Sequence, residues 1–224
     1  MEHGTEQDSA FTGVRDSYLL DAIHELGKKF PPAEQVLHGL QREAEALVVA
    51  DGATMEDVTR FVAINRAVEQ PELSVTTYRN LVASGASGGT VVVFWFWVLE
   101  HLFGEQRFAE IATGTDMTKR WVQMFGGMDE LSDALAPGKN YAPLLGRVAA
   151  MQYSALLAVG RKDEAASFAD DVTAEHARVD VFRALVHAAR EARESEEAVR
   201  ILAKAQTALP PAEFEAVQQA SACD

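Results

Sequence analysis

One stretch decides the fold of this chain: Trp97-Val-Leu-Glu-His-Leu-Phe-Gly-Glu-Gln-Arg-Phe-Ala109. Its frame of an aromatic residue, an apolar stripe, a glycine, a polar turn and an alanine recurs at Tyr153-Ser-Ala-Leu-Leu-Ala-Val-Gly-Arg-Lys-Asp-Glu-Ala165. A third copy, Val186-His-Ala-Ala-Arg-Glu-Ala-Arg-Glu-Ser-Glu-Glu-Ala198, has arginine in place of the glycine. Each copy describes a helix, a tight turn and a second helix that the alanine allows to pack closely. The repeat therefore predicts helical hairpins.

Helical hairpins of this kind leave one apolar face uncovered, so they stack against one another to bury it. The rest of the chain agrees, because almost every segment from Asp16 onward has its apolar residues at helical spacing. We therefore predict an all-α protein of stacked antiparallel helical hairpins, built either as a repeat array or as an irregular helical bundle.

The composition indicates a soluble protein with an acidic surface. The chain has 34 acidic residues against 20 lysines and arginines, and its formal net charge is −14. Such a surface opposes nucleic-acid binding, which needs a basic face to neutralise phosphates. The N-terminus lacks the features of a signal peptide, and the most apolar run, Val91–Leu99, is about half the length needed to cross a bilayer. With a single cysteine, Cys223, we predict a cytoplasmic protein that binds neither nucleic acid nor membranes.

The sequence divides the chain into three parts. Residues 1–13 are polar and are predicted to be disordered, residues 14–84 form N-terminal helical hairpins, and residues 90–222 hold the repeats. The glycine-rich loop Ser84–Thr90 is the most flexible connection and marks the internal boundary. We expect the two helical parts to form one continuous array.

Proline and glycine set the helix limits in the N-terminal part. A helix over 17–30 ends at Pro31-Pro32, and the next one, over 33–50, ends at Asp51-Gly52. Thr54 then fits the N-cap of a third helix, and Asp57 at the third helical position completes a capping box.

Two later segments have less regular patterns. The run from Val91 to Phe103 is rich in β-branched and aromatic residues, which favour a strand. We expect a helix, because the downstream copies are helical and the chain offers no second strand to pair with it. Residues 114–140 contain Gly126-Gly127 and Pro137-Gly138, and we expect short helical pieces there that form an irregular hairpin.

The spacing of the last copies resembles the tetratricopeptide-like superfamily of helical hairpin repeats, whose repeat is about 34 residues long. The residues that match its small, bulky, small and proline positions are Ala198, Leu202, Ala205 and Pro210; the copy before has Ala165, Ala169 and Val172, with Ala177 replacing the proline. The early glycine of the repeat is replaced by Trp97, Tyr153 and Val186. The resemblance covers mainly residues 90–210. It implies an architecture of stacked hairpins but no particular activity.

The sequence shows no metal-binding or catalytic motif. The histidines have neither Glu-x-x-His nor His-Glu-x-x-His spacing. His176, Asp180, His187 and Glu191 would share one stripe on a continuous helix, but the repeat frame ends a helix near Arg178. A solvated face is therefore the preferred interpretation of this stripe. We predict no metal, no cofactor and no catalytic residue.

A dense set of aromatic residues allows other interpretations; its members are Phe94, Trp95, Phe96, Trp97 and Trp121. Core packing is preferred, because the run covers every side of its helix. The alternative function is a small all-α enzyme with an aromatic-lined internal pocket that holds a metal or an organic ligand. A third alternative is an assembly subunit, such as a homodimer, that uses the aromatic patch as its interface.

The resemblance also implies a groove, which the first helix of each hairpin lines at fixed offsets before the turn. Counted back from Gly104, Gly160 and Arg193, the groove positions are Val91, Phe94, Val98 and His101 in the first copy; Arg147, Ala150, Ser154 and Leu157 in the second; and Asp180, Arg183, His187 and Arg190 in the third. The polar residues predicted to contact a partner are His101, Arg147, Ser154, Arg183, His187 and Arg190.

The arginines of this groove suit acidic peptide segments or terminal carboxylates, which accept bidentate hydrogen bonds. The alternative is that Arg183 and Arg190 only pair with Glu191 and Glu194 on an exposed helix. We predict a protein–protein interaction module that binds a peptide or protein segment in the groove, with no chemistry of its own.

Overall fold

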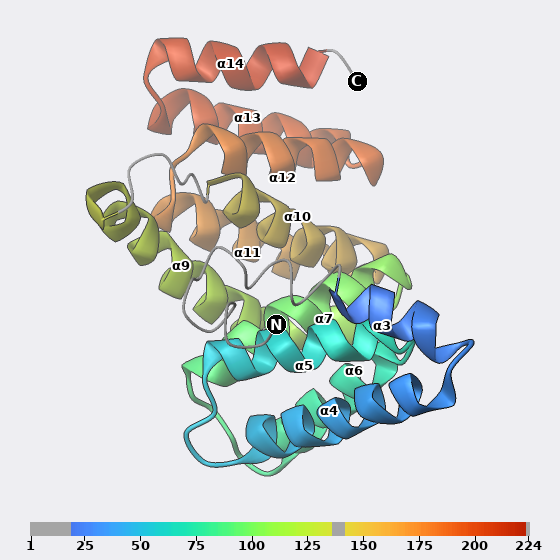
Figure 1. Ribbon diagram of the computed structural model, residues 1–224. Coiled ribbons are helices and arrows are strands. Elements are labelled where there is room, and N and C mark those ends of the chain that lie inside the picture. Colours follow the sequence, from blue (N-terminus) through green and yellow to red (C-terminus); the bar gives the residue numbers. More distant parts are fainter. Residues whose placement is uncertain (1–18, 136–141, 223–224) are drawn as a thin grey trace. The chain divides into compact units, whose positions relative to one another are not determined.

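The computed structural model describes residues 19–135 and 142–222, and every regular element in these two ranges is a helix (Figure 1). Most helices that are neighbours in the sequence pack against each other. The predicted all-α class is therefore confirmed. The segment 1–13, which the sequence predicts to be disordered, lies outside the described residues.

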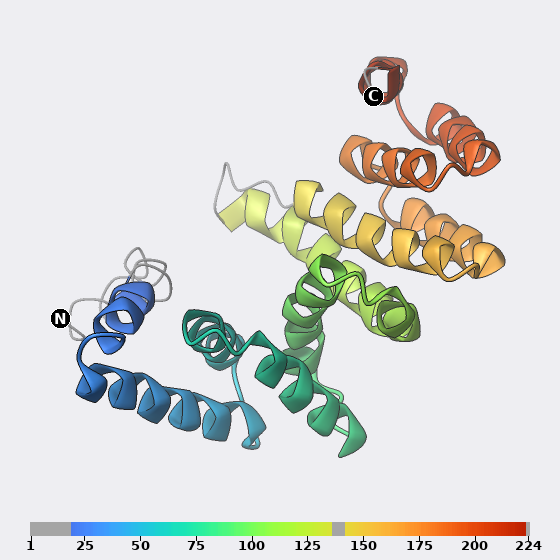
Figure 2. The same cartoon turned by 90° about the vertical axis from the view of Figure 1, so that its right-hand side faces the viewer.

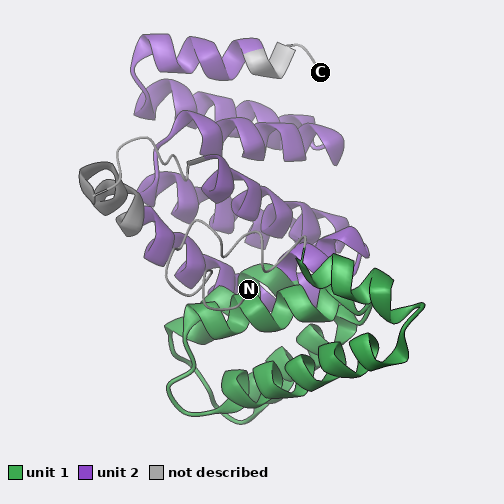
Figure 3. Ribbon diagram, viewed as in Figure 1, with its two compact units in different colours: residues 1–98 green, residues 99–224 purple. Residues whose placement is uncertain are grey.

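The chain forms two compact units, residues 1–98 and residues 99–224 (Figure 3). The division falls within the helix α7 (Gly89–Gly104), shortly after the loop Ser84–Thr90. In its described residues, unit 1 contains α3 (Leu20–Gly27), α4 (Pro31–Val49), α5 (Met55–Ala67), α6 (Pro71–Ala83) and most of α7.

Prolines and a capping box set the limits of the helices in unit 1. Pro31 and Pro71 occupy the first position of α4 and α6, where the missing N–H has no helical partner to lose. The Thr54 hydroxyl accepts a hydrogen bond from the Asp57 N–H (3.2 Å), and the Asp57 carboxylate accepts one from the Thr54 N–H (2.8 Å). Hydrogen bonds from the Thr54 hydroxyl and N–H lower the pKa of Asp57. The predicted capping box is therefore confirmed.

The aromatic run after the glycine-rich loop is a helix, as predicted. Phe94 is completely buried, and its ring meets those of Phe61 (6.1 Å) and Tyr78 (5.7 Å) edge to face. Every residue from Val91 to Trp95 is buried, so this part of α7 is covered on all sides. Burial on all sides explains the apolar composition without a strand.

Unit 2 covers most of the segment in which the sequence predicts repeats. Its described elements are the end of α7, α8 (Phe108–Ile111), the short 3-10 helix η3 (Ala112–Gly114), α9 (Thr115–Leu135), α10 (Ala142–Ala158), α11 (Lys162–Glu175), α12 (Val179–Glu191), α13 (Ser195–Ala208) and α14 (Pro211–Ala222). The helix α10 packs against α9, α11 and α12, and α12 also packs against α13 and α14. The most extensive of these contacts joins α10 to α12.

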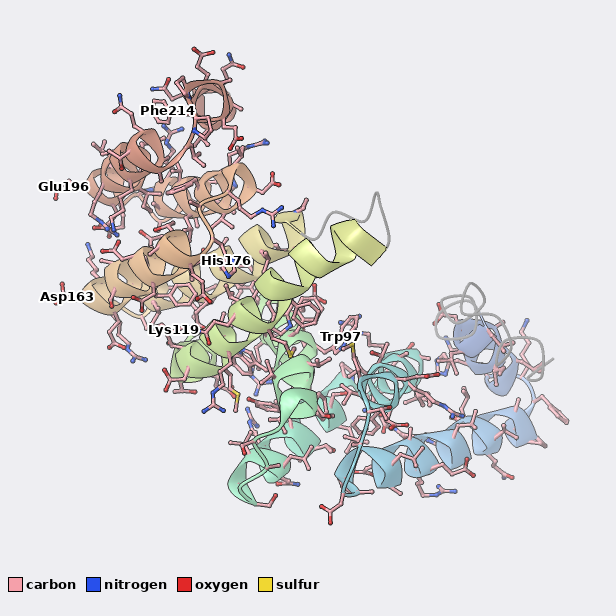
Figure 4. All side chains as sticks on the ribbon, turned by 90° about the vertical axis from the view of Figure 1, so that its left-hand side faces the viewer. Trp97, Lys119, Asp163, His176, Glu196 and Phe214 are labelled. Atoms are coloured by element: carbon pink, nitrogen blue, oxygen red, sulfur yellow. The ribbon has the colours of Figure 1, made fainter. Side chains whose placement is uncertain are left out.

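The helix α9 differs from the expectation of short pieces, because it continues without a break through Gly126-Gly127. The cause is packing at Gly126. A side chain there would meet the imidazole of His176, since a Cβ would lie 1.8 Å from His176 Cε1. Gly126 therefore leaves space in which the His176 side chain packs against α9, and it does not end the helix (Figure 4). Pro137-Gly138 lies outside the described residues.

Five turns that end a helix share one geometry. The turn residue in each has a positive φ: Glu69 (57°), Gly85 (89°), Gln106 (56°), Gly160 (77°) and Arg193 (61°). In the turn of α10, the N–H of Gly160 donates to the carbonyl of Leu157 (3.0 Å), and the next N–H, that of Arg161, donates to Leu156 (2.9 Å). The other four turns repeat these two hydrogen bonds, which define the Schellman motif. The turn of the first copy therefore lies at Gln106, two residues after Gly104.

Substitution by glycine should stabilise the turns whose positive-φ residue is not a glycine. A non-glycine residue pays a steric cost in the left-handed region, so Gln106→Gly and Arg193→Gly should each raise the free energy of unfolding by about 0.5–1 kcal/mol. Gly160→Ala should lower it by about 1 kcal/mol. Urea unfolding followed by circular dichroism measures all three. A loss of stability in both glycine variants would contradict the geometry of these turns.

Candidate functional site

Three helices of unit 2 contribute residues to a surface cavity of about 460 Å³: the last turn of α7, together with α10 and α12. The cavity is lined by Glu100, Phe103, Gly104, Arg147, Ala150, Met151, Ser154, Ala184, His187, Ala188 and Glu191. These are the first helices of the three predicted repeat copies, and α8, η3 and α9 lie between the first of them, α7, and the second, α10. The second helices, α11 and α13, contribute none of the lining residues.

The repeated turn explains why these residues meet. Glu100, Ser154 and His187 stand at the same offset before the positive-φ residue of their respective hairpins. Equivalent positions of three helices therefore line one cavity. In α7 the positive-φ residue is Gln106, and the same offset before it gives Glu100. The predicted frame counts from Gly104 and therefore gives Val98, which does not line the cavity.

The cavity combines apolar residues with charged ones. Phe103, Ala150 and Met151 provide apolar surface. The guanidinium of Arg147 lies 2.7 Å from the carboxylate of Glu100; the Glu100 side chain is only 13% exposed, while that of Arg147 is 62% exposed. The imidazole of His187 lies 3.4 Å from the carboxylate of Glu191. An arrangement of this kind can hold an apolar side chain and hydrogen-bond the chain that carries it.

The structure brings together three of the six residues that are predicted to contact a partner. Arg147, Ser154 and His187 line the cavity. Arg183 and Arg190 are exposed on α12, one turn before and one turn after His187, but they are not among the lining residues. His101 is half-buried and also lies outside the lining, because the frame of α7 is displaced by two positions.

The two outer arginines of α12 are not engaged in the pairs that the alternative interpretation requires. Glu194 instead pairs with Lys162 of α11 (2.5 Å), and Glu191 pairs with His187. Within the described parts of the chain, neither Arg183 nor Arg190 makes an ion pair. Their guanidinium groups are therefore accessible beside the cavity.

The lining residues that were not predicted as groove positions are Glu100, Phe103, Gly104, Met151, Ala184, Ala188 and Glu191. One signal could have identified the first two. Arg107 and Arg161 each follow a turn residue, and each pairs with a glutamate three residues later, Glu110 and Glu164 respectively. Alignment on this shared Arg-x-x-Glu motif sets Gln106 against Gly160 and gives the correct frame for α7.

A buried glutamine fixes the helix α10 behind the cavity. Gln152 has no exposed surface. Its Nε2 donates to the carbonyl of Ile111 (3.1 Å) and the hydroxyl of Thr115 (3.0 Å), and its Oε1 accepts from the hydroxyl of Thr118 (2.8 Å). This network joins α8 and α9 to α10, and it sets the position of the neighbouring residues Met151 and Ser154.

A group of ion pairs joins the second helices, α11 and α13. Arg200 pairs with Glu197 and Asp170, and Lys204 pairs with Asp170 (2.5 Å). Partial burial would raise the pKa of Asp170, but hydrogen bonds from Lys204 and Arg200 outweigh it and lower this pKa. Burial, together with the charge of Glu197, raises the pKa of Tyr153 far above its usual value. These charges hold hairpins together, in contrast to Arg183 and Arg190.

The histidines and acids form no recognisable metal centre in the described ranges. Among these residues, no group of three or more His, Cys, Asp or Glu side chains could hold a metal ion. His176 and His187 also belong to different elements, because α11 ends at Glu175 and α12 begins at Val179. In Figure 4, His176 and Lys119 both lie where α9 meets α11, and Lys119 pairs there with Asp171 (2.6 Å).

The aromatic residues are divided between the two units. Phe94 and Trp95 are buried in unit 1, whereas Trp121 is buried in unit 2 and stacks on Phe125 (4.3 Å). Phe96 and Trp97 are half-buried, and Arg66 of α5 lies 5.1 Å from the Trp97 ring centre, a cation–π geometry. Most of the set therefore packs in two hydrophobic cores.

Comparison with known proteins found no matching family model, no matching curated protein and no matching solved structure. None of the helices in the described residues is long and apolar enough to span a membrane.

Proposed function

We propose that the chain is an interaction module of tetratricopeptide-like hairpins that binds a segment of a partner protein in the cavity of unit 2. One observation carries this proposal: equivalent positions of three first helices, at Glu100, Ser154 and His187, line the same cavity. A repeat produces such a surface without a dedicated catalytic residue. The proposed location is the cytoplasm.

The chemistry of the cavity favours an acidic segment with one apolar side chain. Phe103, Ala150 and Met151 offer the surface for the apolar side chain. Arg183 and Arg190 are exposed beside the cavity and have no carboxylate partner in the described residues. In a chain of net charge −14, two accessible arginines next to an apolar cavity complement carboxylates on a ligand.

Charge reversal at these arginines should abolish binding without unfolding the protein. Ligands are selected from a random dodecapeptide library against the intact chain, and their affinities are measured by fluorescence anisotropy. Each of Arg183→Glu and Arg190→Glu should weaken binding about ten-fold, and the double variant about 100-fold, because each replaces an attraction with a repulsion.

The matched control is Arg120→Glu, an exposed arginine of α9 that does not line the cavity. Its affinity should stay within two-fold of the parent protein. The groove is the wrong site if the selected peptides bind the double variant as tightly as the parent chain.

A further inference from the structure

The cavity of unit 2 is a groove that follows two neighbouring helices. The helices α10 and α12 lie side by side (Figure 1 and Figure 2), and Gly146 near the start of α10 meets Asp180 near the start of α12. On both helices the lining residues have the spacing i, i+3, i+4 and i+7; they are Arg147, Ala150, Met151 and Ser154 on α10, and Ala184, His187, Ala188 and Glu191 on α12. Seven residues span about 10.5 Å along a helix axis, so the groove is two turns long on each helix.

Small residues form much of the groove. Gly104, Ala150, Ala184 and Ala188 are all lining residues, and Met151 adds a longer apolar side chain. Small side chains on neighbouring helices let a further element approach closely. The groove therefore accepts apolar side chains of a ligand whose backbone lies over α10 and α12.

The acidic residues of the lining already have basic groups beside them. Glu100 pairs with Arg147 (2.7 Å), and Glu191 lies 3.4 Å from the imidazole of His187. Arg183 and Arg190, by contrast, are exposed and make no ion pair within the described parts of the chain. The charge that the groove offers to a ligand is therefore the positive charge of these two arginines.

The two arginines stand two helical turns apart. Arg183 and Arg190 are seven residues apart on α12, which corresponds to about 10.5 Å along its axis. His187 lies between them on the same stripe, and it lines the groove. A ligand that contacts both arginines therefore needs two carboxylates at about this spacing, with an apolar side chain between them that enters the groove.

An α-helical ligand meets this requirement. Its residues i and i+7 lie on one face about 10.5 Å apart, and residue i+3 or i+4 lies between them on the same face. In an extended ligand, side chains on one face recur about every 6.7 Å, so carboxylates on that face are about 6.7 Å or about 13.4 Å apart. The spacing of Arg183 and Arg190 matches neither of these values.

We propose that the ligand of this groove is an amphipathic α-helix that lies along α12 and carries two acidic residues seven positions apart. The two acids contact Arg183 and Arg190, and an apolar residue one turn from each acid enters the groove between α10 and α12. Proteins that bind a helix in a groove read it through anchors at this spacing. The helical ligand rests on the binding function proposed above, and it adds the conformation of the bound segment and the spacing of its acids.

Matched synthetic peptides test the conformation of the ligand. The probe is a fluorescein-labelled peptide of sixteen residues, mostly alanine and glutamine, with a glutamate, a leucine four residues later and a second glutamate three residues after that. A hydrocarbon staple on the opposite face holds the helix. One control peptide replaces the staple and a central alanine with an unstapled segment that contains proline, which interrupts the helix. Another control moves the second glutamate two residues further along, to the opposite face.

The probe should bind the full chain at least ten-fold more tightly than either control peptide, as measured by fluorescence anisotropy. The proline peptide keeps the charges but cannot hold them at the helical spacing. The peptide with the displaced glutamate keeps the helix and the net charge but presents only one acid to α12. Both differences therefore report the geometry of the ligand rather than its composition.

Exchange of charges tests which acid contacts which arginine. Arg190→Glu should weaken binding of the probe about ten-fold, because it places two like charges together. Lysine in place of one of the two glutamates of the probe should restore the affinity of this variant, whereas lysine in place of the other should not. The other lysine peptide should restore the affinity of Arg183→Glu, since a bound helix lies in one direction. Arg120→Glu should bind the unchanged probe as the parent chain does.

The outcomes separate the helical ligand from the binding site itself. A probe that binds no more tightly than the proline peptide would overturn the helical ligand; the site would still stand if library-selected peptides lose affinity in the Arg183→Glu/Arg190→Glu variant. A displaced glutamate that leaves the affinity unchanged would overturn the seven-residue spacing. A probe that binds this double variant as tightly as the parent chain would contradict both the helical ligand and the site.

Discussion

Gly146→Val should lower the free energy of unfolding by about 3 kcal/mol and abolish ligand binding in the cavity. A Cβ at Gly146 of α10 would lie 2.6 Å from the backbone carbonyl oxygen of Asp180 at the start of α12. Backbone cannot rotate out of the way as a side chain can, so α12 must move off α10. This contact is the most extensive in unit 2, and Arg147, His187 and Glu191 depend on it for their positions.

The matched control for this change is Gly39→Val on α4, where an added Cβ meets nothing within 4 Å. Its stability should change by less than about 0.5 kcal/mol. Both variants are unfolded with urea at sub-micromolar concentration, at which association contributes nothing, and are followed by tryptophan fluorescence. Equal stability of the two variants would mean that α10 and α12 are not in close contact at Gly146.

Gln152→Leu should lower the free energy of unfolding by about 2–3 kcal/mol. Leucine fills a similar volume but leaves the carbonyl of Ile111 without its donor, and the hydroxyls of Thr115 and Thr118 lose their amide partner. Ile111, Thr118 and Gln152 are buried and Thr115 is half-buried, so water does not replace the lost hydrogen bonds freely. The cavity should widen as α9 detaches, and peptide affinity should fall with stability.

Gln123→Leu supplies the comparison for this prediction, since Gln123 is an exposed glutamine of α9 outside the network. Its unfolding free energy should stay within about 0.5 kcal/mol of the parent value. Differential scanning calorimetry measures the unfolding free energies of the two variants. A Gln152→Leu protein as stable as the Gln123→Leu protein would show that the amide network does not hold α10 in place.

The helical class and several helix limits followed from local patterns. The capping box at Thr54 and Asp57 is a contact within four residues, so composition and spacing are enough to predict it. The repeated turns at Gly160 and Arg193 were predicted for the same reason, because the flanking apolar stripe and alanine frame them. Neither prediction needed knowledge of distant contacts.

The errors arose where a distant contact decides the local structure. Gly126-Gly127 carries a low helix propensity, and the sequence therefore favours a break. The structure keeps α9 intact because the imidazole of His176 occupies the space that Gly126 leaves open. The sequence around the two glycines does not indicate that His176, fifty residues later, packs against Gly126.

The cavity could be predicted only in part. Arg147, Ser154 and His187 were found because their two hairpins have the expected turn residue, whereas Glu100 and Phe103 were missed. Gln106 adopts the left-handed conformation that glycine favours, so the turn of α7 carries no glycine signal. The ion pair between Glu100 and Arg147 joins two hairpins, and a frame built on one hairpin at a time does not reveal it.

The most direct test of the groove is site-specific photo-crosslinking with a selected peptide. A benzophenone amino acid replaces Ser154, which lines the cavity, or Asp163, which is exposed at the start of α11 (labelled in Figure 4). We expect a covalent adduct from position 154 and none from position 163. In the Arg183→Glu/Arg190→Glu background, the adduct from position 154 should disappear. Crosslinking at position 163 but not at position 154 would contradict the assignment of the cavity as the binding site.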